Sequence, residues 1–174
     1  MKKITKTVTA LFLAAFFFSY ESNAQVSVGA DLGMFKTLTE GSEAQLGVNF
    51  NVGYSINDQT LVGVNLGYYM KSYDFLGSNL TSFTIPITAL FEYSFSDNDF
   101  SPYAGANVGI YRFGISGLGE TTASGYLGLA PVVGVNYDFS NNLTFKGNLK
   151  YHYVITDVES TSAFGINAGL SYNF

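Results

Sequence analysis

Apolar and polar residues alternate along most of the chain with a period of two residues. The clearest segment is 44–56, where even positions from Leu46 onward are large and apolar and the odd positions are not. Its apolar row is Leu46, Val48, Phe50, Val52, Tyr54 and Ile56. A period of two places successive side chains on opposite faces of a β-strand. The pattern therefore predicts a strand with one apolar face and one small polar face.

The same alternation predicts eight strands in all. Their approximate ranges are 26–35, 44–56, 60–71, 80–95, 102–113, 126–139, 143–156 and 164–174. Short turns follow the second, fourth and sixth strands, and loops of roughly seven to eleven residues follow the others, which is typical of an up-and-down barrel. Closing such a sheet requires the eighth strand to pair with the first, beside residues 26–34.

Two prolines interrupt this pattern without changing its phase. Pro86 lies inside the fourth strand and Pro131 inside the sixth. Proline lacks the N–H that a sheet ladder uses, and a closed sheet has no edge on which to place it. A one-residue bulge would invert the alternation, and the apolar parity continues unchanged through Pro86. We therefore expect an interrupted ladder in the original register.

The N-terminus has the pattern of a secretory signal peptide. Lys2, Lys3 and Lys6 precede an apolar run at 10–18, and Ser22-Asn23-Ala24 provides the small residues of a cleavage site. We expect a signal peptide at 1–24 and a single barrel domain at 25–174. The chain has no cysteine, so neither a lipid-modified Cys nor a disulfide is expected.

Composition then decides what surrounds the barrel. Residues 25–174 carry five Lys and Arg and twelve Asp and Glu, a formal net charge of −7, which disfavours nucleic acid as a partner. These charged residues are about 11% of the segment, well below the roughly 25–35% of a soluble surface. A soluble lipocalin-like barrel would also have to place eight apolar rows in a narrow lumen. The sequence therefore predicts an all-β, eight-stranded antiparallel up-and-down transmembrane β-barrel with its apolar face in lipid.

Aromatic residues cluster where the two interfaces of a membrane should lie. Those expected at the periplasmic interface are Tyr54, Tyr93, Phe95, Tyr137, Phe139, Phe145, Tyr172 and Phe174. Those expected at the outer interface are Tyr68, Phe83, Tyr151, Tyr153 and Phe164.

The inward parity of several charged residues predicts a polar network in the lumen. Counting along the strands puts Lys150 near the height of Asp31, and Lys146 near that of Glu92. Because an unpaired buried charge is costly, we expect these four residues to pair. Such a network would seal the barrel against ions.

Candidate catalytic residues are few. His152 is the only histidine and has inward parity, but it lies in His152-Tyr153-Val154, whereas lipid A deacylases of this size carry a His-x-Ser pair. We therefore interpret His152 as a polar lumen residue and expect neither a catalytic residue nor a cofactor. No metal-ligand spacing is present. The acidic residues of the loops are interpreted as a solvated rim: Glu40, Glu43, Asp74, Glu120, Asp157 and Glu159.

The C-terminal strand, which ends in Tyr172, Asn173 and Phe174, and the segment Ile85-Pro86-Ile87 carry a family resemblance. The chain resembles the small bacterial outer-membrane β-barrels of the OmpA-like and OmpX-like (porin-like) kind. The resemblance implies a location in the Gram-negative outer membrane with both termini in the periplasm. It also implies recognition of Tyr172 and Phe174 by the barrel-assembly machinery, and a monomer in contact with lipid and lipopolysaccharide.

The resemblance does not select one physiological role. The leading hypothesis is a non-enzymatic barrel with a structural, envelope-integrity or surface-interaction role. The alternatives are an outer-membrane lipid A-modifying enzyme and a narrow pore for small solutes.

Overall fold

The computed structural model describes residues 26–75, 78–117, 119–157 and 159–174. The expected signal peptide, 1–24, and its cleavage site before Gln25 lie outside these residues. Within them, no helix is long and apolar enough to cross a membrane.

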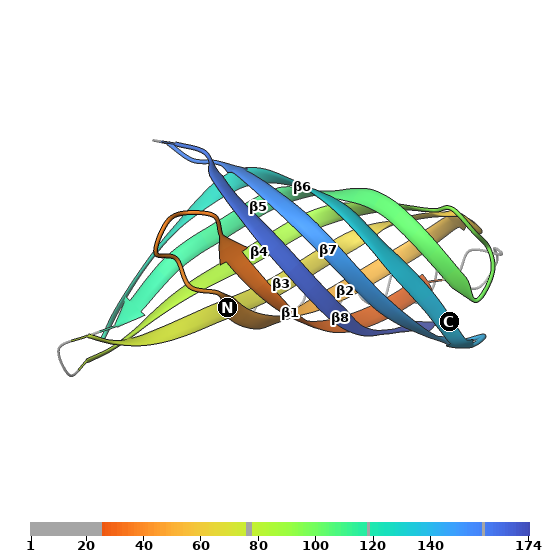
Figure 1. Ribbon diagram of the computed structural model, residues 1–174, viewed down its shortest axis with the longest axis horizontal. Coiled ribbons are helices and arrows are strands. Elements are labelled where there is room, and N and C mark those ends of the chain that lie inside the picture. The colour runs from red at the N-terminus through yellow and green to blue at the C-terminus, as the bar shows by residue number, and fades with distance from the viewer. Residues whose placement is uncertain (1–25, 76–77, 118, 158) are drawn as a thin grey trace, which may run out of the picture.

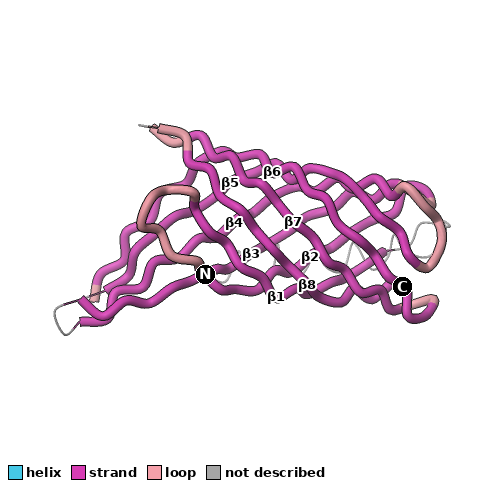
Figure 2. Tube along the Cα trace, viewed as in Figure 1, coloured by secondary structure: helices cyan, strands magenta, loops and turns pink. Residues whose placement is uncertain are grey.

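Eight antiparallel strands form one closed barrel, as the alternation predicts (Figures 1 and 2). The strands are β1 (Val26–Thr37), β2 (Gln45–Asn57), β3 (Thr60–Phe75), β4 (Ser78–Ser94), β5 (Phe100–Gly117), β6 (Glu120–Ser140), β7 (Leu143–Ile155) and β8 (Thr161–Asn173). Each strand pairs with its neighbours in sequence, and β8 pairs with β1. At this closure the Phe174 N–H donates to the Val26 carbonyl at 2.9 Å.

We call the two ends of the barrel the turn end and the loop end. The turn end carries the short connections after β2, β4 and β6, together with the C-terminus, on the right of Figure 1. The loop end carries the connections after β1, β3, β5 and β7, on the left. There the prediction of loops at 72–79 and 114–124 is wrong, because β3 and β4 continue as strands to Phe75 and from Ser78, and β5 and β6 to Gly117 and from Glu120. These two long hairpins reach furthest to the left in Figure 1.

The predicted parity of the strands is confirmed by burial. On β1, Asp31 is 4% exposed whereas the next residue, Leu32, is 72% exposed. The inward face of the barrel therefore carries mainly small polar side chains, and the outward face carries most of the large apolar ones. This arrangement is the reverse of a soluble barrel and suits a lipid surround.

Both prolines keep the register, as the sequence predicts. Pairing of β3 with β4 is interrupted at Gly67 and Tyr68, opposite Pro86 and Ile85, and resumes in the same register. Pairing of β6 with β7 has a similar gap at 130–131, opposite 151–152. Neither gap contains a bulge, so the apolar and polar faces stay in phase on both sides of each proline.

Candidate functional site in the barrel interior

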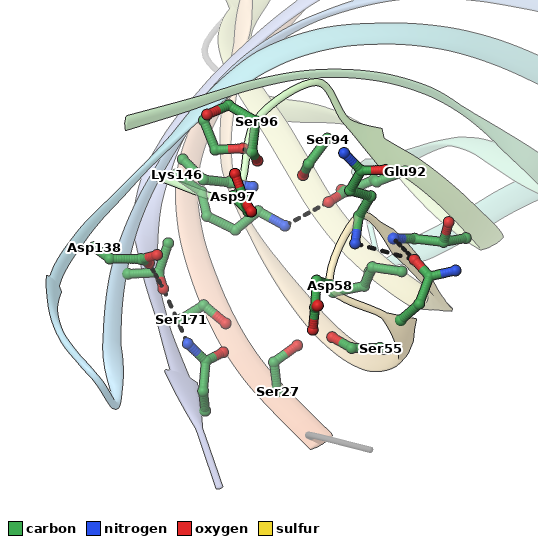
Figure 3. Close-up of a pocket in the computed structure, with 18 of the residues that line it drawn as sticks. Ser27, Ser55, Asp58, Glu92, Ser94, Ser96, Asp97, Asp138, Lys146 and Ser171 are labelled. Carbon is green, nitrogen blue, oxygen red and sulfur yellow. Dashed lines mark hydrogen bonds and ion pairs between the residues drawn. The ribbon is translucent and has the colours of Figure 1, made fainter. Parts of the chain in front are cut away.

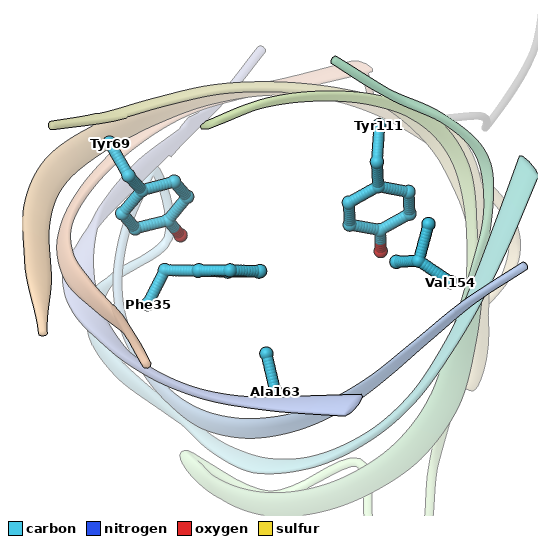
Figure 4. Close-up of a cluster of buried hydrophobic side chains, with 5 residues drawn as sticks. All are labelled: Phe35, Tyr69, Tyr111, Val154 and Ala163. Carbon is cyan, nitrogen blue, oxygen red and sulfur yellow. The ribbon is translucent and has the colours of Figure 1, made fainter. Parts of the chain in front are cut away.

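An aromatic cluster fills the lumen on the loop-end side. It joins residues of five strands, Phe35, Tyr69, Tyr111, Val154 and Ala163, each at most 1% exposed. Figure 4 shows the Tyr69 and Tyr111 rings entering the lumen from the wall, with Phe35 between them and Ala163. Phe113 and Tyr126 pack against the cluster. An eight-stranded barrel has room only for its own side chains, and here aromatic rings occupy that room.

Inward-facing glycines make space for aromatic rings in the lumen, both in this cluster and at Tyr103 nearer the turn end. A Cβ atom at Gly128 would lie 2.6 Å from Cε2 of Tyr111, and one at Gly134 would lie 2.7 Å from Cε1 of Tyr103. Real Cβ atoms do not approach other atoms so closely, so a side chain at either glycine would require the facing ring to move. The alternation of glycine with aromatic residues on the inward face is therefore a packing arrangement.

Hydrogen bonds among three asparagine side chains and the Tyr69 hydroxyl join four strands on the turn-end side of the cluster. The Tyr69 hydroxyl donates to Oδ1 of Asn167 at 2.7 Å, and Nδ2 of Asn49 donates to the Tyr69 hydroxyl at 2.8 Å. Asn167 in turn donates from Nδ2 to Oδ1 of Asn148 at 2.9 Å. The network is buried, and hydrogen bonding of this kind offsets the cost of burying polar groups.

Of the four charged residues expected to pair, the structure brings two together. Nζ of Lys146 lies 2.7 Å from Oε2 of Glu92, and the side chains are 13% and 11% exposed. Asp31 instead accepts a hydrogen bond from Nδ2 of Asn51 at 2.7 Å. Lys150 is buried, and the ion pairs found among the described residues do not include it. Counting heights along the strands thus located the Lys146–Glu92 contact, and the other two residues have no ion pair with each other.

His152 lies inside the barrel, as its parity predicts, and contacts aromatic rings. Nδ1 of His152 lies 2.9 Å from the Tyr111 hydroxyl, and its ring centroid lies 4.9 Å from that of Phe35. A hydrolytic site would need a serine nucleophile and an orienting carboxylate beside the histidine. In the described part of the chain, the hydrogen-bond partner of His152 is a tyrosine, and no cluster of potential metal ligands is found.

Two cavities open toward the two ends. The turn-end cavity has a volume of about 450 Å³ and is lined mainly by hydroxyl, amide and carboxylate side chains, with Glu92 and Lys146 among them (Figure 3). The carboxylates of Asp58, Asp97 and Asp138 also face it. A second hollow of about 400 Å³ lies at the loop end and is lined in part by Phe113, Ile115 and Tyr126.

Aromatic pairs mark both ends of the outward face. Tyr93–Phe95, Tyr137–Phe139 and Tyr172–Phe174 make edge-to-face contacts at the turn end, with centroids 5.0–5.7 Å apart. At the loop end, Tyr68 stacks on Phe83 with centroids 6.5 Å apart, and Tyr151 meets Phe164 edge to face at 5.4 Å. These positions agree with the two belts expected from the sequence.

The alternation of residues did not by itself predict the aromatic cluster, although the sequence contains a signal for it. Phe35, Tyr69, Tyr111 and Tyr126 all have inward parity, where most neighbours are glycine, asparagine or serine. Large rings at inward positions, opposite inward glycines on the next strand, would have predicted a packed lumen.

The sequence matches a family model over residues 7–174, and the description of that family is outer membrane protein beta-barrel domain. Comparison with curated proteins finds no match. Among solved structures, the chain is similar to Neisserial surface protein A, at 22% identity over 88% of this chain and 98% of that one, with a TM-score of 0.70.

Two further structures have the same fold. Ail, the attachment invasion locus protein of Yersinia pestis, solved in complex with the heparin analogue sucrose octasulfate, is 14% identical, with coverage of 88% and 100% and a TM-score of 0.65. A major outer membrane protein from Thermus thermophilus is 16% identical, with coverage of 88% and 100% and a TM-score of 0.58.

Proposed function

The chain belongs to the outer membrane protein β-barrel domain family, and on that premise we propose that it is a non-catalytic barrel with a closed lumen. Its role lies in envelope integrity or in interactions at the cell surface. In this proposal the turn end and both termini face the periplasm, the loop end faces the exterior, and the barrel is a monomer in lipid and lipopolysaccharide. The signal peptide at 1–24 directs export, and the assembly machinery reads Tyr172 and Phe174.

The observation that carries the closed lumen is the aromatic cluster. Phe35 and Tyr69 are each 1% exposed and Tyr111 is fully buried, so neither water nor a solute reaches these rings from either cavity. The Lys146–Glu92 pair supports the same conclusion from the turn-end side, because it joins β7 to β4 across the lumen. Side chains rather than a separate plug segment close the barrel in this proposal.

Conductance measurements in a planar bilayer test the closed lumen. The refolded protein should give no steady nanosiemens-scale conductance. The double variant Phe35→Ala with Tyr111→Ala, checked for folding by heat-dependent electrophoretic mobility, removes two rings of the cluster and should conduct more. Steady conductance from the unaltered protein would refute the closed lumen and favour the pore alternative.

The non-catalytic part of the proposal is supported by the surroundings of His152, whose hydrogen-bond partner is Tyr111 rather than a serine or a carboxylate. Mass spectrometry of lipid A from a strain lacking the protein tests it. The acyl pattern should equal that of the parent strain. A changed pattern that the wild-type chain restores and His152→Ala does not would establish the enzyme instead.

The ligand seen with Ail is not proposed for this chain. Sucrose octasulfate is a polyanion, and anions are recognised by clustered cations. The loop end here carries six acidic residues against Lys36, Lys71 and Arg112, and Lys71 is already paired with Glu43 at 2.9 Å. The excess of acidic residues at the loop end therefore favours a positively charged partner over a polyanion.

A further inference from the structure

The turn-end cavity is lined almost entirely by side chains that carry oxygen. Among the described residues around its volume of about 450 Å³, Leu61 is the one apolar member and none is aromatic. This volume lies in the range of roughly 300–1,000 Å³ that is typical of small-molecule sites. The charged members are four carboxylates and one ammonium, that of Lys146, which is paired with Glu92 at 2.7 Å. The cavity therefore has a formal excess of three negative charges and many hydrogen-bond acceptors.

Three of the carboxylates lie at the mouth of the cavity and come from three different hairpins. Asp58 is in the turn between β2 and β3, Asp97 is in the connection between β4 and β5, and Asp138 is near the end of β6. Figure 3 shows Asp138 on the left of the cavity and Asp58 on the right, with Asp97 between them. In the described part of the chain, no group of three potential metal ligands is found. The spread of these carboxylates suits a ligand with several separated positive charges better than a single metal ion.

Hydrogen bonds hold the backbone of these hairpins in place. Oδ1 of Asn57 accepts the Thr60 N–H at 2.8 Å, which closes the turn around Asp58. The Asp138 N–H donates to the Asp99 carbonyl at 2.8 Å and so joins β6 to the β4–β5 connection. The carboxylates are therefore presented on ordered backbone, which lowers the cost of ordering a loop when a ligand binds.

Two buried hydroxyl groups in the cavity wall have no hydrogen-bond partner among the described side chains. Ser171 is 6% exposed and Ser27 is 8% exposed, and Figure 3 shows both hydroxyls directed into the cavity. By contrast Thr144, a wall residue with similar burial, donates to Asp138. Because buried polar side chains normally have such partners, these two hydroxyls point to a ligand that bonds to them from within the cavity.

The lining also selects among classes of ligand. An ammonium group has N–H donors and no acceptor, so it complements carboxylates, amide oxygens and hydroxyls. A quaternary ammonium is recognised by aromatic faces, and the described lining has none. An anion would meet one cation, which Glu92 already neutralises. Ammonium groups spaced along a flexible chain, as in an aliphatic polyamine, can reach the separated carboxylates and the two hydroxyls together.

We propose that the turn-end cavity binds a linear aliphatic polyamine. Its ammonium groups contact the carboxylates at the mouth, Asp58, Asp97 and Asp138, and donate to the hydroxyls of Ser27 and Ser171 in the wall. The proposed function assigns no ligand to this end of the barrel; in the orientation proposed above, the polyamine enters from the periplasm.

Isothermal titration calorimetry tests the site on the full chain refolded in a zwitterionic detergent, with spermidine as the probe. Spermidine has three ammonium groups; the matched ligands are putrescine, which has two, and the uncharged 1,6-hexanediol. Spermidine should bind saturably, about threefold or more tighter than putrescine because of the additional charge contact, and hexanediol should not bind. Raising NaCl from about 20 to about 200 mM should weaken spermidine binding several-fold, because salt screens the contacts at the mouth.

Paired variants separate a ligand held in the cavity from a general attraction of cations. Asp58→Asn with Asp97→Asn keeps the shape of the mouth and should weaken spermidine binding about fivefold, the effect of two exposed charge contacts. Asp74→Asn with Asp157→Asn makes the same change of charge at the loop end and should leave the affinity unchanged. Folding of each variant is checked by heat-dependent electrophoretic mobility.

Two single variants test the wall and the floor of the cavity. Ser171→Ala removes a buried hydroxyl without changing the charge, and should weaken spermidine binding about threefold or more because a hydrogen bond to a charged group is lost. Lys146→Met removes the ammonium that neutralises Glu92 and should strengthen spermidine binding several-fold. A charge-only attraction to the outside of the barrel would not respond to Ser171→Ala.

Four outcomes would overturn the polyamine site. They are no saturable binding of spermidine, equal affinity for spermidine and Mg²⁺, equal weakening by the turn-end and loop-end pairs of variants, and an affinity that Ser171→Ala does not change. Binding of a lysine-rich peptide without binding of spermidine would assign the cavity to a protein segment and would also overturn the proposal. Conductance distinguishes this failure from failure of the closed lumen: a conducting barrel that binds spermidine refutes only the closed lumen, and a sealed barrel that does not bind it refutes only the polyamine site.

Discussion

Removing the positive member of the lumen ion pair should destabilise the barrel more than removing the negative one. In Lys146→Met the side chain keeps most of its length, but the Glu92 carboxylate loses the ammonium that lies 2.7 Å away. In Glu92→Gln the amide oxygen still accepts a hydrogen bond from Lys146. The ammonium also keeps the Tyr103 ring, whose centroid is 5.3 Å from Nζ.

The expected size follows from burial. Breaking a buried ion pair by removing one partner costs roughly 3–5 kcal/mol, because the other charge stays buried without compensation. Glu92 and Lys146 both line the turn-end cavity, so water can reach the remaining charge in part. We therefore expect Lys146→Met to lower the free energy of unfolding by about 2–3 kcal/mol, and Glu92→Gln by about 1 kcal/mol.

A double-mutant cycle isolates the interaction. The variant with both changes has no unpaired carboxylate and should lose less than the sum of the single changes, by about 1 kcal/mol or more. Unfolding in urea is followed by far-ultraviolet circular dichroism and by electrophoretic mobility, since the chain has no tryptophan. Equal losses for the two single variants would refute the expected difference between them, and losses that add within about 0.3 kcal/mol would show that the contact at 2.7 Å contributes no net coupling.

Three further predictions concern packing, lipid contact and assembly. Gly128→Ala places a Cβ where Tyr111 lies, 2.6 Å from its Cε2, and should cost about 1–3 kcal/mol of stability in the same urea assay; an unchanged midpoint would contradict the packing argument. Leu32→Lys puts a cation on the outward face midway between the aromatic belts and should cost about 2–4 kcal/mol, whereas Leu32→Val should cost far less, and equal losses would argue against lipid at this face. Deletion of Phe174 should slow assembly and lower the amount of folded protein in outer-membrane fractions, and normal levels would argue against its role as a signal.

Alternation predicted the closed barrel and its strand parity, and the C-terminal strand together with Ile85-Pro86-Ile87 carried the resemblance to its family. These features depend on the contrast between rows such as Leu46 to Ile56 and their small polar neighbours, and that contrast is strong wherever a strand crosses lipid. The strand structure at the tips of the two long hairpins was harder to predict, because residues 72–79 and 114–124 lie beyond the apolar rows and contain many turn-forming residues. Strand structure there comes from backbone ladders between long neighbours, and hydrophobic patterning does not report such ladders.

Inside the barrel, the parity of a residue predicted whether its side chain points into the lumen, but not which other side chain it contacts. It placed Lys146, Glu92 and His152 in the lumen, and counting heights brought the first two to the same level. Whether two inward side chains meet also depends on shear around the barrel and on what lies between them. Oδ2 of Asp31 accepts a hydrogen bond from Asn51, an asparagine with the same parity that a count of charges alone ignores. The rings that fill the loop-end side depend on glycines on neighbouring strands, and only the register reveals which glycine each ring faces.

The two prolines interrupt the hydrogen-bond ladder at two boundaries between strands, and so separate β4 to β6 from the other strands of the wall at mid-height. Ladder gaps at 67–68 opposite Pro86, and at Pro131 opposite 151–152, lie on the β3–β4 and β6–β7 boundaries. The three strands between them, β4 to β6, are therefore joined to each neighbour along a seam with fewer cross-strand hydrogen bonds. Amide exchange should be fastest along these two seams at mid-height. Any local opening of the wall at these two seams would therefore move β4, β5 and β6 together.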